Sequence, residues 1–132
     1  MDYKAQALEF FKGDIYAMET TGIEIDEVDV NTAKCHLNID GRHLNAADCV
    51  MGGAIFTLAD FTMAVAANAG RPQTVSLNMN INYLCPAKGP TLFAEATCVK
   101  DGRSVCFYQV NVTDSQGKTV ATATGSGFRK QG

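Results

Sequence analysis

The chain has 132 residues, of which 46% are hydrophobic and 19% charged, and this balance suits a single globular domain spanning residues 1–132. Its 11 basic and 14 acidic residues give a net charge of −3 with no basic cluster, which argues against binding to nucleic acid or to an anionic membrane. Five cysteines without a C-x-x-C pair and only two histidines argue against a metal site and favour reduced thiols in a cytoplasmic protein.

The first third of the chain changes from a helical to a strand period. Residues 3–12 predict an amphipathic helix, and the segment is too charged to be a signal peptide. The buried stripe of this helix is expected to contain Leu8, Phe10 and Phe11. Residues 23–30 and 32–39 alternate apolar and polar side chains with a period of two, which predicts one or two strands.

Residues 52–68 predict a long helix that is apolar on nearly every side and ends before Gly70. The surrounding window, 49–69, holds Asp60 and lacks basic flanks, so we expect a buried helix and not a membrane span. An ionised carboxylate in such a helix costs free energy unless it is paired, hydrogen-bonded or hydrated. Asp60 therefore either lies on a wet edge of the helix or has a functional role.

Four strands are predicted beyond the helix, at residues 74–84, 91–99, 104–113 and 119–128. In the first of them, strict alternation predicts an apolar face with Val75, Leu77, Met79, Ile81 and Tyr83. The opposite, polar face is predicted to carry Ser76, Asn78, Asn80 and Asn82. The turns K-D-G-R and D-S-Q-G-K join the last three strands as hairpins, which predicts an antiparallel sheet. The fold class is therefore α+β, with a curved sheet wrapped around the long central helix.

Three motifs lie between residues 43 and 89. They are His43-Leu44-Asn45; Gly52-Gly53 with Leu58 and Asp60; and Val75-Ser76, Met79-Asn80-Ile81 and Tyr83 followed by Pro86-Ala87-Lys88. With this spacing the chain resembles the acyl-CoA thioesterases of the phenylacetate-degradation (PaaI-like) family, and its order of elements resembles the hotdog fold. The resemblance implies an enzyme that hydrolyses acyl- or aryl-CoA thioesters.

Two residues depart from the family pattern. Met51 stands where the family has a histidine before the glycine pair, and Asp48 stands where it has a turn glycine. Methionine can neither donate a hydrogen bond nor carry a positive charge. The resemblance assigns the thioester oxygen mainly to the backbone N–H of the next residue, Gly52, and a backbone donor survives a side-chain change. An alternative function is a non-catalytic or weakly active protein that binds and senses acyl-CoA.

Thioester hydrolysis needs a group that polarises the carbonyl and a base that activates water. The N–H of Gly52, in the first turn of the helix, has no intrahelical acceptor and offers the first, unless the glycine pair serves only close packing. Asp60 offers the second as base or nucleophile. The resemblance adds Asn45, which would hold the oxygen with Gly52 unless it only closes its own turn. It also adds Ser76, which would orient the water unless it is an ordinary strand serine.

Gly52 and Asp60 are eight residues apart, about 12 Å along a helix that rises 1.5 Å per residue. One carbonyl cannot contact both residues on the same helix. If two copies of the helix run antiparallel across a two-fold axis, Gly52 of one subunit meets Asp60 of the other. We therefore expect a homo-oligomer, either a dimer or a dimer of dimers (a homotetramer).

The remaining candidates concern the substrate. Gly53 and Met51 are expected to border the thioester, and the CoA phosphates are expected to meet cations near the polar loops. The candidates for that phosphate contact are Arg71, Lys88 and Arg103, with Ser104 beside the last. Four apolar residues are expected to pack in the core, with the lining of an acyl tunnel as the second role considered: Met51, Met63, Phe56 and Phe61. No metal or redox cofactor is expected, and a hotdog hydratase is disfavoured because neither His36 nor His43 has an aspartate at the required spacing.

Overall fold

The structure is a computed structural model that describes residues 1–130. It contains two α-helices, a π-helical turn (η1), a short 3-10 turn (η2) and six strands. Their bounds are α1 Tyr3–Phe11, η1 Tyr16–Thr21, β1 Ile23–Asp29, β2 Thr32–Asn38, η2 Gly41–His43, α2 Gly52–Asn68, β3 Thr74–Tyr83, β4 Thr91–Asp101, β5 Val105–Asp114 and β6 Thr119–Arg129. The strands form one antiparallel sheet in the order β1-β2-β4-β5-β6-β3.

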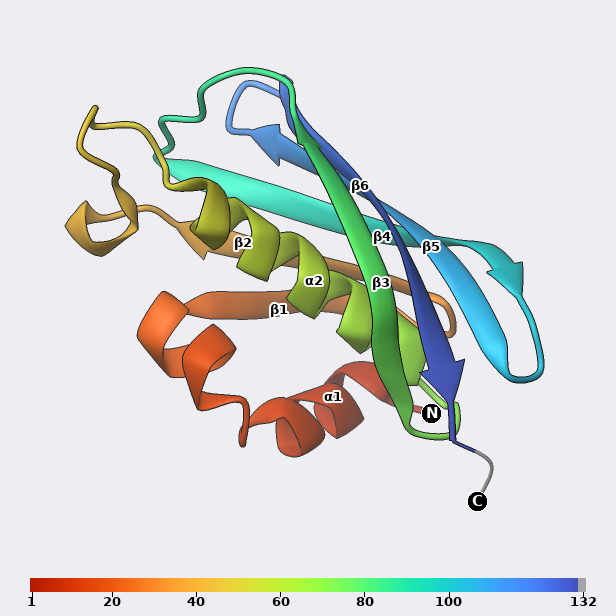
Figure 1. The fold of residues 1–132 in the computed structure, drawn as a ribbon. Helices are drawn as coiled ribbons and strands as arrows, with labels where there is room; N and C mark the ends of the chain where they lie inside the picture. The colour runs from red at the N-terminus through yellow and green to blue at the C-terminus, as the bar shows by residue number, and fades with distance from the viewer. Residues whose placement is uncertain (131–132) are drawn as a thin grey trace.

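The sheet curves around α2, which crosses its concave face (Figure 1). Leu58, Ala59, Val65 and Ala66 of α2 are fully buried against the inner faces of the strands. Gly125 of β6 lets the helix approach closely, because a Cβ at this position would lie 2.5 Å from Met63 Sδ. The predicted α+β hotdog architecture is confirmed, as is the predicted span of the central helix. Within residues 1–130 no helix is long and apolar enough to cross a membrane.

The prediction for the first helix is partly wrong. Phe11 is buried and packs edge-on against Phe61 of α2, with 5.2 Å between the ring centroids. Leu8 and Phe10, however, are 41% and 58% exposed. The helix lies at the edge of the fold, beside β1 and the C-terminal half of α2, so only the narrow i, i+4 stripe of Ala7 and Phe11 is covered (Figure 1).

A β-bulge corrects the predicted faces of β3. Ser76 pairs with Gly127, but the next pair in the ladder is Asn78 with Ser126, so Leu77 is an extra residue in β3. The bulge turns Ser76 to the same face as Met79, Ile81 and Tyr83, toward α2. Val75 lies on the outer face with the three asparagines. The alternation predicted from the sequence is therefore right beyond the bulge and inverted before it.

A buried arginine fixes the C-terminal end of α2. The guanidinium of Arg129, 1% exposed, donates hydrogen bonds to Ala67 O at 2.7 Å, Thr74 Oγ1 at 2.9 Å, Asp101 Oδ1 at 3.0 Å and Tyr108 Oη at 3.0 Å. A buried charge is tolerated when it is paired and hydrogen-bonded in this way. The network ties α2 to four strands, and nothing in the sequence pattern pointed to it.

Candidate active site

The first turn of α2 presents free backbone donors. Its N-cap residue, Met51, makes no side-chain hydrogen bond, and the N–H groups of Ala54 and Ile55 both donate to Met51 O. The N–H groups of Gly52 and Gly53 have no acceptor among residues 1–130. Unpaired amides at a helix N-terminus, reinforced by the helix dipole, attract a developing negative charge.

The loop before α2 holds Asn45 in a defined orientation. Its Oδ1 accepts hydrogen bonds from Ala47 N at 2.9 Å and Cys49 N at 3.1 Å. The two donors identify the side-chain oxygen, so the Nδ2 amide group is the end that remains for another partner, and it has none within the described part of the chain. The two roles considered for Asn45 are therefore compatible: the oxygen closes the turn and the nitrogen can donate outward.

Asn45 and Gly52 line one open cavity of about 570 Å³. Tyr83, the last residue of β3, lies in its wall and donates a hydrogen bond from its hydroxyl to Gly52 O at 2.9 Å. Sequence reasoning placed Tyr83 in a motif but gave it no role. Its position at the end of a strand, beside a loop predicted to hold substrate, is the signal that was available.

Asp60 and Ser76 come together at the middle of α2. The Ser76 hydroxyl donates to Asp60 Oδ1 at 3.4 Å, a contact made possible by the bulge in β3. Burial raises the pKa of the Asp60 carboxyl above its ordinary value of 3.8, the Ser76 hydrogen bond lowers it, and the charge of Asp14 raises it further. A carboxylate with a raised pKa is a better proton acceptor than an ordinary surface carboxylate.

The sheet leaves one stripe of α2 only partly covered. Its members lie at positions spaced by three or four residues and include small side chains: Gly53, Phe56, Thr57, Asp60 and Ala64. Asp60 is thus on a wet edge of the helix, as one reading of the sequence required. Within one chain, the candidate site is split into two halves, about 12 Å apart along α2.

The candidate phosphate-binding residues are dispersed. Lys88 is exposed and follows Pro86 and Ala87, which line the cavity beside Gly52. Arg103 and Ser104 are exposed in the β4–β5 turn, at the other end of the molecule.

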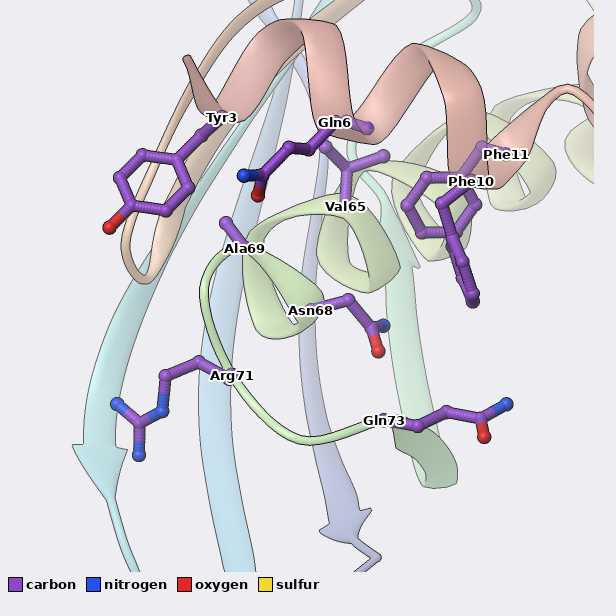
Figure 2. Close-up of a pocket in the computed structure, with 10 residues that line it drawn as sticks. Tyr3, Gln6, Phe10, Phe11, Val65, Asn68, Ala69, Arg71 and Gln73 are labelled. Atoms are coloured by element: carbon purple, nitrogen blue, oxygen red, sulfur yellow. The ribbon is translucent and has the colours of Figure 1, made fainter. Parts of the chain in front are cut away.

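Arg71 lies past the C-terminal end of α2 and pairs with Asp101, its Nη2 being 2.9 Å from Oδ1. It borders a second cavity of about 270 Å³ between α1 and α2, in whose wall Phe11 and Val65 lie (Figure 2). The structure thus places Arg71, Arg103 and Ser104 away from Gly52 of the same chain.

The candidate acyl-lining residues separate into two groups. Phe61 and Met63 are buried core residues, 3% and 1% exposed, whereas Phe56 is half-buried on the open stripe and Met51 is 51% exposed. The predicted core position is therefore confirmed for Phe61 and Met63, whereas Phe56 and Met51 lie outside the core.

Neither histidine lies in the cavity beside Gly52. His43 is buried, accepts from Asp40 N at 3.0 Å and donates from Nε2 to Thr21 O at 2.7 Å, so both ring nitrogens hold the loop in place. His36 does form an aspartate pair that sequence spacing missed, with Nδ1 2.8 Å from a carboxylate oxygen of Asp26. That pair lies on the outer face of the sheet, opposite α2.

Comparison with known proteins gives consistent matches. Residues 48–121 match the Thioesterase superfamily. The chain is 30% identical to acyl-coenzyme A thioesterase PaaI of Escherichia coli, over 98% of this chain and 94% of that protein. It is 34% identical to acyl-coenzyme A thioesterase 13 of Homo sapiens, over 66% of this chain and 65% of that protein.

Solved structures agree with these sequence matches. The PaaI protein of the E. coli phenylacetic acid degradation operon superposes with a TM-score of 0.91 at 27% identity, covering 98% of this chain and 95% of that one. A hypothetical thioesterase protein of Streptococcus pneumoniae, solved with coenzyme A, superposes with a TM-score of 0.84 at 25% identity, covering 91% and 96%.

Proposed function

Since the chain belongs to the thioesterase superfamily, we propose that it is an enzyme that hydrolyses acyl- or aryl-coenzyme A thioesters to the free acid and coenzyme A. Two relatives that carry the name acyl-coenzyme A thioesterase support this reaction, and the S. pneumoniae structure with coenzyme A supports the substrate class. The reaction needs only a polarised carbonyl and an activated water, so no metal or redox cofactor enters the proposal. Cytoplasmic coenzyme A thioesters would be the substrate pool.

In the proposed reaction, the thioester oxygen accepts hydrogen bonds from Gly52 N–H and from the Nδ2 group of Asn45. Asp60 takes a proton from a water molecule as the water attacks the carbonyl carbon. The C–S bond then breaks, and the proton held by Asp60 passes to the departing sulfur of coenzyme A. The Ser76 hydroxyl, already within reach of the carboxylate, orients that water. The raised pKa of Asp60 strengthens it as a base, and the amides of Gly52 and Gly53 stabilise the developing oxyanion.

The two halves of the site belong to different subunits in this proposal. Two antiparallel copies of α2 related by a two-fold axis would bring Gly52 of one chain beside Asp60 of the other. The open stripe of α2 supports the contact, because its small side chains allow close approach of a second helix. Strand β3 also supports a contact between subunits. It lies at the end of the sheet, its outer edge is unpaired among residues 1–130, and its Leu77 is 59% exposed.

The same two-fold symmetry would decide which subunit supplies each cation that contacts the phosphates of coenzyme A. The C-terminal end of α2 of one subunit would lie beyond the N-terminal end of the other, which would carry Arg71, Arg103 and Ser104 toward the partner's cleft. Lys88 would approach the phosphates from the subunit that supplies Gly52. A dimer of dimers would pair outer sheet faces, where Phe107 is 42% exposed.

One observation supports the proposal most directly. A carboxylate of raised pKa, hydrogen-bonded to a serine hydroxyl, lies on the stripe of α2 that the sheet covers only in part. The N-terminus of the same helix presents amides that have no acceptor among the described residues. The reaction has to unite these two halves, and the partner subunit supplies the geometry.

The test is a thiol-release assay with short, medium, long and aromatic acyl-coenzyme A thioesters. Turnover of at least one of them, with kcat at least ~10² lower in Asp60→Asn, is the expected result. If no substrate is hydrolysed while one binds tightly, the protein is an acyl-coenzyme A sensor, the function that the replacement of a histidine by Met51 favours.

A further inference from the structure

The hydroxyl of Tyr83 is hydrogen-bonded to the first turn of α2, the part of the helix that receives the thioester in the proposed reaction. It donates a hydrogen bond to Gly52 O at 2.9 Å, and the ring lies against the same glycine. A Cβ at position 52 would be 3.2 Å from Tyr83 Cζ and 3.3 Å from its hydroxyl oxygen. The ring therefore packs against the α-carbon of Gly52, and a side chain at this position would push the ring by a few tenths of an ångström.

The first turn of α2 needs such a restraint because it has no ordinary cap. An N-cap serine, threonine, aspartate or asparagine would hold the turn by accepting from the second or third helical N–H. Met51 cannot accept in this way, and the next two residues are glycines, whose backbones have the most conformational freedom. A conventional cap that accepts from the second helical N–H would also occupy the amide of Gly53, one of the two amides proposed to stabilise the oxyanion. A restraint on the Gly52 carbonyl leaves both amides free.

We propose that Tyr83 is a positioning residue that holds the first turn of α2 by the Gly52 carbonyl and so aims the unpaired N–H groups at the thioester oxygen. The inference rests on the proposed hydrolysis. Because the oxygen gains negative charge only as the reaction proceeds, an amide that is badly aimed loses most in the transition state. Tyr83 therefore acts on kcat more than on KM.

The variant that tests this is Tyr83→Phe, which removes the hydroxyl and keeps the ring in the cavity wall. The loss of one hydrogen bond predicts a fall in kcat of about 3- to 10-fold. KM should change less than about 2-fold, because the ring and the substrate-lining surface remain. Tyr16→Phe is the matched control: this tyrosine is 68% exposed in η1, and its variant should keep the wild-type kcat.

A second measurement does not depend on turnover. Hydrogen exchange of the Ala54 and Ile55 amides, which donate to Met51 O in the first turn, should become faster in Tyr83→Phe when followed by NMR in the ligand-free protein, while exchange in the middle of α2 stays unchanged. Unchanged exchange together with unchanged kcat would overturn the inference. A rise in KM with kcat preserved would also overturn it, because Tyr83 would then be a binding residue. If the wild-type protein hydrolyses no thioester, the proposed function fails, and the exchange measurement alone decides whether Tyr83 holds the turn.

Discussion

An active site shared between two subunits should regain activity when two inactive variants are mixed, provided that each variant damages a different half of the site. Asn45→Asp keeps an oxygen for the loop amides of Ala47 and Cys49 but replaces the Nδ2 donor with a second acceptor. Asp60→Asn removes the base and keeps its size and polarity. Each variant refolded alone should be inactive, because both sites of its dimer carry the same lesion.

The size of the effect follows from the structure. Gly52 and Asp60 lie about 12 Å apart on α2, too far for one carbonyl, whereas Ser76 lies beside Asp60 and Asn45 lines the cavity beside Gly52. In a mixed dimer, one composite site therefore receives both lesions and the other receives neither. When the variants are unfolded and refolded together at equal amounts, half of the dimers are mixed, and half of their sites are intact. About a quarter of the wild-type activity should return.

The assay is thiol release from the best acyl-coenzyme A substrate, with heterodimer formation verified by mass spectrometry of differently tagged subunits. Separately refolded variants provide the baseline. If verified heterodimers show no gain over that baseline, each site lies within one chain. The proposal that two antiparallel copies of α2 form the site would then be wrong, and so would the explanation that it gives for Asp60 in an apolar helix.

Asp60, Met51 and Asp101 can each be tested by a single substitution. Asp60→Asn should lower kcat by at least ~10² with little change in KM, as measured by steady-state kinetics. Because the folded-state pKa of Asp60 is raised, its contribution to stability is full below the unfolded-state pKa and is lost as pH rises through the folded-state pKa. The variant should therefore melt above the wild type at pH 7 and lose this advantage at pH 3; an equal Tm at both pH values contradicts the assignment. Met51→His should keep the wild-type Tm, since Met51 is 51% exposed, and should retain or raise activity; a large loss of Tm would show that Met51 is a packed anchor. The hydrogen bond from Arg71 holds the pKa of Asp101 at about 2, below its ordinary 3.8, so its contribution to stability is full above pH 4 and is lost as pH falls toward 2. Asp101→Asn should accordingly lower the Tm at pH 7, where Arg129 also loses a charged partner, and lower it much less at pH 2; thermal melts at the two pH values check the sign.

The fold was predictable because its signals are local. The 17 residues of α2 are apolar without the period of a strand, and the last three strands are joined by turns of hairpin composition. The network around Arg129 was not predictable, because it joins residues from distant parts of the chain whose pairing depends on the finished sheet. The exposure of Leu8 and Phe10 was missed for a related reason: a hydrophobic stripe shows which residues can be buried, while the area available for burial depends on what the helix meets.

The candidate site shows where a periodic pattern stops being informative. Alternation along β3 assigns Ser76 to the face opposite Met79, and on that face it could never reach Asp60. One unpaired residue, Leu77, reverses the assignment, because a shift of one residue moves every side chain before it to the other face of the sheet. Val-Ser-Leu-Asn carries no glycine or proline that would mark a bulge. The family motif nevertheless named Ser76 correctly as the neighbour of Asp60, because a motif preserves the result of the bulge without revealing its cause. The contact between Ser76 and Asp60, which the proposed mechanism uses, is thus created by an irregularity that no strand pattern predicts.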